Sequence, residues 1–188
     1  MTAEIRIDFD RIEEQLAAVR ATITPGAMLK GIGEAGKYWV NQNFELDGAL
    51  VGGWEPLSPN TIAGRKGGSS RPLQDTGNLR QSFDYAISGN TVRIGTSVQY
   101  ASFHDEGTGP YDIYPVHAKS LAFMTAGGMI FAKHVAHPGI PQRRMLPDED
   151  DMVQIAQAVL DALVQDNLRK VMGGAPRVIR RNLRGAAA

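Results

Sequence analysis

The stretch YASFHDEGTGP, from Tyr100 to Pro110, holds side chains of the types that perform chemistry. It combines two aromatic residues, one histidine and two acids with two glycines. Histidine and carboxylate groups bind metal ions and transfer protons. The chain has four histidines, all in one part of the sequence: His104, His117, His134 and His137. With Asp105 and Glu106 beside the first, three such ligands and a water would make a hydrolytic metal site.

The spacing of these histidines argues against such a site. The sequence contains no HExxH motif and no HxH pair. On a strand, a separation of three residues places His134 and His137 on opposite faces. No serine lies in a GxSxG motif, and there is no cysteine to act as a nucleophile or a thiolate ligand. We therefore expect a protein that is not an enzyme and has no metal and no cofactor. A metal-dependent hydrolase that uses the four histidines stays an alternative.

A structural role explains the stretch from Tyr100 better. Residues 100–104 have helical spacing, so a short helix would bury Tyr100 and Phe103 against a sheet. Gly107 would end this helix through a left-handed cap, and Gly109-Pro110 would turn the chain back. This arrangement leaves three polar residues on an exposed rim: His104, Asp105 and Glu106.

Two helices are predicted at the start of the chain. The first has an apolar stripe at alternating spacings of three and four: Phe9, Ile12, Leu16 and Val19. Thr24-Pro25 is typical of an N-cap followed by proline in the first turn, and opens the second helix. Its stripe is Met28, Ile32, Ala35 and Trp39. Both stripes are expected to pack on the core.

Residues 47–77 are rich in glycine, serine and proline, and their apolar residues are too scattered for a continuous element. A short helix is plausible from Ser58 to Gly64, with Pro59 in its first turn. A connection of this length is usually functional or disordered until something binds it. We therefore expect a long mobile loop, with Arg65 and Lys66 in its basic part.

The remaining elements are strands and one long helix. One helical turn in TGNLRQS precedes a hairpin, in which Phe83, Tyr85 and Ile87 alternate with polar residues before the turn at Gly89-Asn90. Residues 111–138 predict two or three more strands, the last pair turning at Gly127-Gly128. A helix follows with an acidic start. Its buried face is expected to be Met152, Ile155, Val159 and Leu163.

This order of elements predicts an α+β fold with a single, mostly antiparallel sheet around the hairpin. Two N-terminal helices and one long C-terminal helix would flank that sheet. We expect one domain over residues 1–172 and a basic extension over residues 173–188, which has four arginines and no acid.

Composition narrows the function classes. The 188 residues contain 20 basic and 20 acidic side chains, so the chain has no overall attraction for nucleic acid. The basic stretches RKGGSSR and RVIRRNLR keep a nucleic-acid-binding module as an alternative, without an aromatic stacking platform beside them. No apolar run approaches the length of a membrane span, and no signal region is seen at the start. We expect a soluble protein that is made and used inside a cell.

Four stretches follow one another in an order that resembles a known family: WEPLSPNTIAGRKG, LQDTGNLRQSF, VRIGTSVQYASFHDEGTG and IPQRRMLPDEDDMVQIAQAVLDAL. They resemble the phage virion morphogenesis family, the tail-completion proteins of Mu-like and P2-like phages. The middle stretches are also similar to the neck proteins of the HK97-like tail-component family. The resemblance covers Trp54 to Leu163. The chain departs from the pattern at Arg144, where proline is common, and at Pro147.

The resemblance implies a structural virion protein at the neck or tail end, assembled in the host cytoplasm. Its implied partners are further copies of itself in a hexameric ring, tail tube and sheath proteins, head connector and neck proteins, and in passing the DNA; no membrane is implied. The candidate contact residues are Arg65, Lys66, His104, Asp105, Glu106, Arg143, Arg144, Arg177, Arg180, Arg181 and Arg184. The expected structural anchors are Trp54, Leu79, Tyr100, Phe103 and Gly107.

Overall fold

The computed structural model describes residues 9–65, 68–125 and 127–171. The α+β class predicted from the sequence is confirmed. The helices are α1 (Phe9–Thr22), α2 (Pro25–Glu45), the 3₁₀ helix η1 (Ala49–Val51), α3 (Pro59–Ala63), α4 (Asn78–Gln81), α5 (Ala101–Asp105) and α6 (Glu149–Val171). The strands are β1 (Phe83–Ser88), β2 (Thr91–Thr96), β3 (Tyr111–Ile113), β4 (Leu121–Thr125), β5 (Gly128–Ala132) and β6 (Val135–His137).

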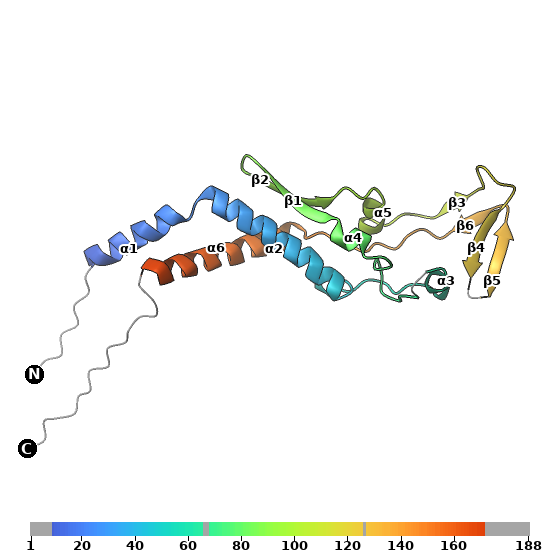
Figure 1. The fold of residues 1–188 in the computed structure, drawn as a ribbon, viewed down its shortest axis with the longest axis horizontal. Helices are drawn as coiled ribbons and strands as arrows, with labels where there is room; N and C mark the ends of the chain where they lie inside the picture. The colour runs from blue at the N-terminus through green and yellow to red at the C-terminus, as the bar shows by residue number, and fades with distance from the viewer. Residues whose placement is uncertain (1–8, 66–67, 126, 172–188) are drawn as a thin grey trace, which may run out of the picture.

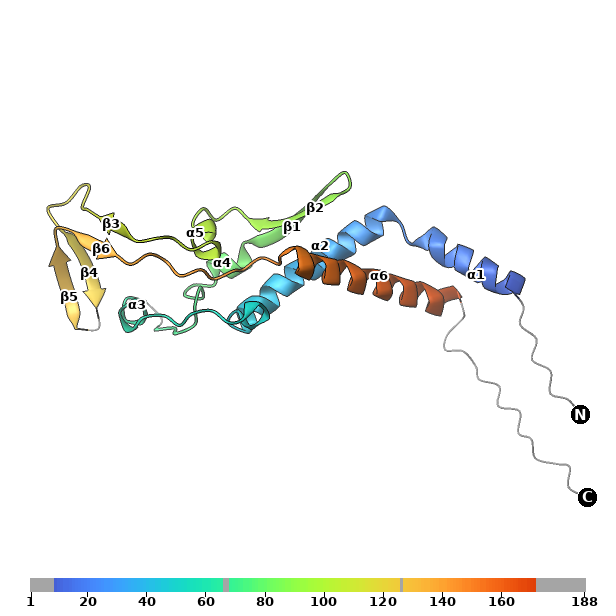
Figure 2. The ribbon, with the colours of Figure 1, turned by 180° about the vertical axis from the view of Figure 1, so that it is seen from behind.

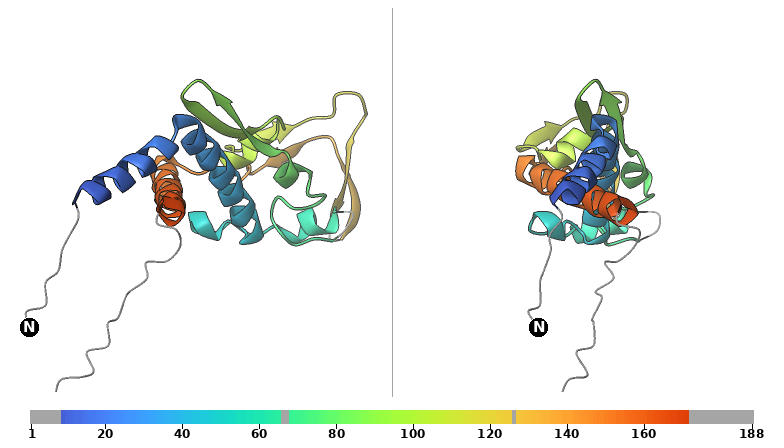
Figure 3. Two further views of the ribbon diagram at one scale, coloured as in Figure 1. Left: turned by 60° about the vertical axis from the view of Figure 1, so that its left-hand side comes forward. Right: turned by 90° about the vertical axis from the view of Figure 1, so that its left-hand side faces the viewer.

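The molecule is elongated. Helices α1 and α6 lie at one end, and strands β3 to β6 lie at the other (Figure 1, Figure 2). Helix α2, the β1–β2 hairpin, α4 and α5 occupy the middle. Helix α6 contacts both α1 and α2, and Figure 3 shows α1 and α6 together at the same end. None of the helices in the described ranges is long and apolar enough to cross a membrane.

The second helix begins at its predicted place. The Thr24 side chain accepts a hydrogen bond of 3.2 Å from the backbone N–H of Ala27, and Pro25 occupies the first helical position. The stripe expected on α1 is largely wrong for the single chain, since Val19 is buried whereas Ile12 and Leu16 are exposed. The reason is that α6 is the main element that contacts α1, so much of the surface of α1 is left uncovered.

The part of helix α2 before Val40 packs through glycines rather than through the expected apolar stripe. The expected residues from Met28 to Trp39 are only half-buried, whereas Gly33 and Gly36 are fully covered. A Cβ atom at Gly33 would collide with the ring of Tyr85, and one at Gly36 with the Ile94 side chain. The β1–β2 hairpin therefore lies directly on the α2 backbone. A pattern of apolar residues cannot reveal a face made by missing side chains.

The expectation of a single sheet is wrong. Three separate two-stranded antiparallel sheets are present, β1 with β2, β3 with β6, and β4 with β5. The predicted turn at Gly89-Asn90 is confirmed by the register of β1–β2. The turn predicted at Gly127-Gly128 is placed one residue too late, because Gly128 already pairs with Thr125 as the first residue of β5. The sheets stay apart because β2 leads into helix α5 rather than into another strand. Strands β3 and β6 are also only three residues long.

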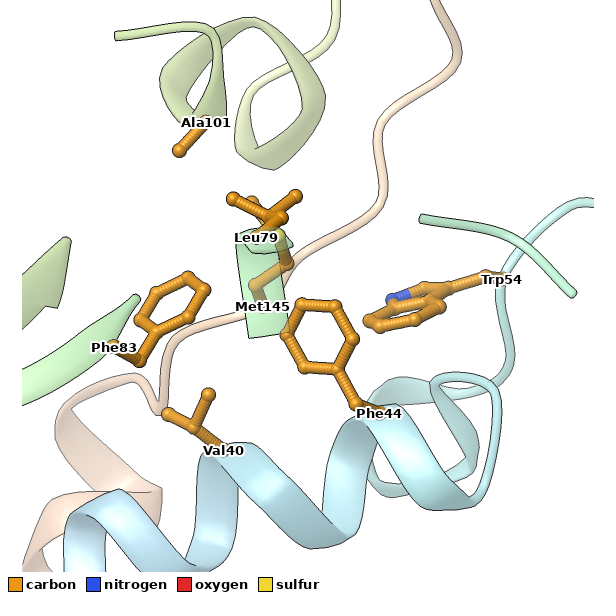
Figure 4. Close-up of a cluster of buried hydrophobic side chains, with 7 residues drawn as sticks. All are labelled: Val40, Phe44, Trp54, Leu79, Phe83, Ala101 and Met145. Atoms are coloured by element: carbon orange, nitrogen blue, oxygen red, sulfur yellow. The ribbon is translucent and has the colours of Figure 1, made fainter. Parts of the chain in front are cut away.

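The hydrophobic core lies where α2 meets α4, α5 and the start of β1. Its buried members are Val40, Phe44, Trp54, Leu79, Phe83, Ala101 and Met145 (Figure 4). The ring of Phe44 lies edge-on to Trp54, with centroids 5.1 Å apart, and 5.8 Å from Phe83. Trp54 and Leu79 thus occupy positions typical of structural anchors.

The segment before α6 is fixed to this core by backbone groups. The carbonyl oxygen of Arg144 accepts hydrogen bonds from Trp54 Nε1 at 3.0 Å and from Asn43 Nδ2 at 3.1 Å. Residue Met145, next in the chain, is only 1% exposed. This extended segment joins α2, the segment after η1 and α5 into one unit.

Residues 47–77 have more structure than their composition suggests. Helix α3 begins as expected, with the Ser58 side chain accepting a hydrogen bond from the N–H of Thr61 at 3.2 Å. Arg71 forms an ion pair with Asp47 at 3.0 Å and donates to the carbonyl oxygen of Glu45 at 2.6 Å. The mobility of this segment in the free subunit stays a prediction.

Candidate functional site

Helix α5 presents Asp105, not its aromatic residues, to the rest of the protein. The Asp105 carboxylate accepts hydrogen bonds from the backbone N–H of Met145 at 2.6 Å and of Leu146 at 3.4 Å. Arg143 adds a backbone hydrogen bond of 2.7 Å to the carbonyl oxygen of His104. Asp105 therefore holds the core segment at Met145 in place, and was wrongly expected on an exposed rim.

The expected burial of Tyr100 and Phe103 is wrong for the single chain. Tyr100 is 46% exposed and Phe103 is 55% exposed. The cause is the register of α5, which begins at Ala101. Ala101 and Asp105 are four residues apart and share the inward face, so Phe103 points away from it. Glu106 is exposed, as expected of the rim.

Gly107 ends this turn in a conformation that favours glycine. Its φ is +76°, and a Cβ atom would lie 2.9 Å from both the backbone nitrogen of Gln142 and the carbonyl oxygen of Ile140. Thr108 then pairs with Ile140 through a backbone hydrogen bond of 2.8 Å. The turn is thus a rigid junction between the core and the β3–β6 ribbon.

A cleft of about 480 Å³ opens beside this turn, lined in part by Glu55, Arg65, Asp75, Tyr100, His104 and Arg143. Burial lowers the pKa of His104, and the charge of Arg143 lowers it further. The buried Nδ1 of His104 has no hydrogen-bond partner among the described atoms. No carboxylate therefore orients the imidazole there, as the orienting group of a nucleophilic dyad would. The cleft is lined by apolar side chains as well as by charges of both signs.

Arg143 is a structural residue rather than a free contact residue. It is buried, and its Nε and Nη2 donate to the carbonyl oxygen of Glu55 at 3.1 and 2.9 Å. Burial lowers the pKa of its guanidinium, Glu55 acts in the opposite direction, and Arg65 lowers it further. The sequence could not show this, because nothing in a local pattern marks an arginine that holds a distant carbonyl group.

The other candidate arginines also have partners within the chain. Arg144 forms ion pairs with Asp148 and, at 3.3 Å, with Asp151 at the start of α6. Arg65 donates to the carbonyl oxygens of Ser69 at 2.9 Å and Arg71 at 2.7 Å. The remaining candidates lie outside the described residues: Lys66, Arg177, Arg180, Arg181 and Arg184. The basic extension over residues 173–188 lies outside them as well.

The histidines do not converge. In the described ranges, no three histidine, aspartate or glutamate side chains lie close enough to hold a metal ion. His134 contacts Asp112 at 2.7 Å and stacks on Tyr114, with ring centroids 4.8 Å apart. His137 stacks on Tyr111, also at 4.8 Å. These pairs bracket the β3–β6 ribbon, while His117 is exposed in the loop that follows β3.

The part of the chain with the most unusual surface is the β arm, defined here as residues 111–137. In its β4–β5 hairpin, cross-strand partners share a face. Leu121 and Phe123 lie half-buried on one face, and β4 contacts α3. We call the other face the outer face; its residues are Ala122, Met124, Met129 and Phe131, and all four are exposed. The Phe131 side chain is 71% exposed.

Sequence reasoning missed this outer face, although a signal for it was present. LAFMT and GMIFA are nearly continuous apolar runs. A strand with one face in water alternates apolar and polar residues, whereas a continuous run indicates that both faces become covered. The single chain covers only one of them. The outer face is therefore the best candidate for a surface that contacts another protein.

Comparison with known proteins agrees with an assembly role for such a surface. Searches of curated proteins and of solved structures gave no significant match. The phage virion morphogenesis family, in contrast, matches residues 7–165. This range contains every described element except the last turns of α6. The chain therefore belongs to the phage virion morphogenesis family.

Proposed function

We propose that the protein is a tail-completion subunit, which forms a ring at the end of a phage tail tube and joins it to the head connector. Its place in the family supports a structural or assembly role in the virion. The finer assignment is supported by one observation, the uncovered outer face of the β4–β5 hairpin. The proposed partners are other copies of the chain, tube and sheath proteins, and the connector.

The outer face supports assembly because the arm is incomplete by itself. A two-stranded hairpin is at best marginally stable in water and needs further strands or packing. Both faces of this hairpin are apolar, and α3 is the helix that contacts it. Contiguous exposed apolar surface marks sites of protein contact. An arm of this kind suits a subunit that completes its packing only within an assembly.

The shape of the chain supports a ring rather than a two-fold dimer. The arm and the α1–α6 helices lie at opposite ends of the long axis (Figure 1). Contacts between two different surfaces of the same subunit generate a ring when the rotation closes. We propose six copies, because the phages whose tail-completion proteins this sequence resembles have tail tubes with six-fold symmetry.

The test uses tails from a lysate in which this protein is not made. Purified protein is added, and bound rings are viewed end-on by electron microscopy, with joining to filled heads scored as infectivity. We expect a ring at one end of each tube and restored infectivity. Phe131→Ser should abolish both, whereas Tyr38→Ser, on an equally exposed aromatic residue of α2, should not. Tubes that stay bare, or protein bound only along their sides, would contradict the proposal.

A further inference from the structure

The two ends of the molecule both carry apolar surface that the described part of the chain leaves uncovered. At one end is the outer face of the β4–β5 hairpin. At the other end is the α1 stripe, defined as Ile12 and Leu16, which are 41% and 49% exposed. These two residues are four apart and so lie next to each other on one side of the helix. The α1 stripe and the outer face cannot meet within one chain, because the long axis separates them (Figure 2).

The charges of the two ends are opposite. Helix α1 has three acidic and two basic residues, and α6 has five acidic and two basic residues. The β arm has one acid, Asp112, and two lysines, Lys119 and Lys133. Asp112 contacts His134, and neither lysine forms an ion pair within the described part of the chain. Among the described residues, helices α1 and α6 are thus acidic and the arm is basic.

We propose that the outer face of one copy docks on the α1 stripe of the next copy, with the arm lysines facing the acidic α1–α6 end. This inference deepens the proposed function and rests on it, since it names the two surfaces that build the ring. Opposite charges favour this pairing and oppose its alternatives, because an arm-to-arm contact would bring like charges together. An arm-to-arm contact would also be two-fold and would close as a dimer.

The proposal explains why the α1 stripe has the pattern of a core helix while remaining exposed in the single chain. Its apolar spacing is that of a helix that packs on one side. The neighbouring arm supplies the missing partner, and Phe131, the aromatic residue of the outer face, is the expected anchor. A buried aromatic residue dominates such an interface, so its removal should weaken association by about tenfold or more.

The absence of cysteine from the chain makes a direct test possible. Leu16→Cys and Ala122→Cys are made singly, together, and each with Tyr38→Cys as the control position. Ala122 is the cross-strand partner of Phe131 on the outer face, so the anchor is kept. All three native side chains are exposed, so the variants keep the fold. Proteins are oxidised in the assembled state, and a parallel sample is treated with a bismaleimide that spans about two helical turns, or about 11 Å. The products are separated under denaturing conditions.

We expect mixed Leu16→Cys and Ala122→Cys proteins to give a covalent dimer, and the double variant to give a ladder that ends at the ring size. Pairs that contain Tyr38→Cys should give little product. Cross-links mainly between two Ala122→Cys proteins, or equal yields with Tyr38→Cys, would overturn the docking inference. Binding of the unmodified chain to tail tubes is measured separately. Tube binding without the expected cross-link refutes only this docking, whereas absence of tube binding refutes the proposed function.

Discussion

Replacing Asp105 by alanine should destabilise the free subunit, although the residue looks like a surface acid in the sequence. Its carboxylate accepts from the N–H of Met145 at 2.6 Å and from the N–H of Leu146 at 3.4 Å. Alanine removes the one oxygen, Oδ1, that accepts both bonds at the point where the chain enters the core. The Met145 side chain is almost fully buried, so its backbone N–H has little access to replacement water.

The expected loss follows from the shorter of the two bonds. A hydrogen bond to a charged group contributes about 1.5–3 kcal/mol net, and a buried donor left without a partner costs about 1–3 kcal/mol. Because the second bond is near the limiting length, we expect Asp105→Ala to lower the free energy of unfolding by about 2–3 kcal/mol. For a chain of this size that corresponds to a fall in Tm of about 4–12 °C.

Urea unfolding followed by circular dichroism at neutral pH measures this difference, with three further variants for comparison. Asp105→Asn keeps one acceptor without its charge and should lose about 1 kcal/mol. Glu106→Ala and Phe103→Ala change exposed side chains and should stay within about 0.5 kcal/mol of the parent. If Asp105→Ala is as mild as Glu106→Ala, or if Phe103→Ala is the most damaging of the set, the assignment of the faces of α5 is refuted.

Three further predictions concern His104, the turn at Gly107 and the long connection. Burial lowers the pKa of His104, so the unfolded chain binds a proton at this residue more tightly than the folded chain does. Stability should therefore fall as the pH drops below about 6.5, and His104→Asn should reduce that fall, as measured by urea midpoints at about pH 7.5 and about pH 5.5, on either side of the ordinary histidine pKa. Gly107→Ala should lower the free energy of unfolding by about 2–3 kcal/mol, because of the positive φ and the close backbone neighbours of Gly107. As a control, Gly109→Ala places a Cβ atom that meets nothing within 4 Å and should lower it by less than about 1 kcal/mol. Equal losses in the two variants would contradict the role of the turn. Within residues 47–77, amide hydrogens between α3 and Arg71 should exchange rapidly in the free subunit and slowly in the ring, and strong protection before assembly would count against this prediction.

The sequence predicted the elements that depend on local chemistry. Thr24-Pro25 opens α2, Ser58-Pro59 opens α3, and Gly89-Asn90 turns the β1–β2 hairpin, because each signal acts on its own backbone neighbours. The long helix α6 and its buried Ile155 also follow from a local period. The family resemblance was also inferred from local signals, short motifs in a fixed order. The family match over residues 7–165 confirms it.

The sequence did not predict features that depend on distant partners. The inward side of α5 is decided by hydrogen bonds from Met145, which is forty residues away from Asp105. The buried face of α2 includes two glycines beside Val40 and Phe44, and the glycines carry no apolar signal. The apolar face of α1 was predicted, and the apolar faces of the β4–β5 hairpin could have been. An apolar pattern does not say whether the surface that packs against it belongs to the same chain or to another one.

The carbonyl group of Arg144 has a consequence for the order of events during synthesis. It accepts hydrogen bonds from Asn43, 101 residues earlier, and from Trp54, 90 residues earlier. Closing loops of this length costs conformational entropy before the contact can offset that cost, and this slows folding. A chain still on the ribosome can form α2 and the β1–β2 hairpin, but their shared core stays open until residue 145 has emerged. The arm is synthesised before that residue, so its apolar outer face is exposed in the partly folded nascent chain. We therefore expect host chaperones to bind this chain during its synthesis.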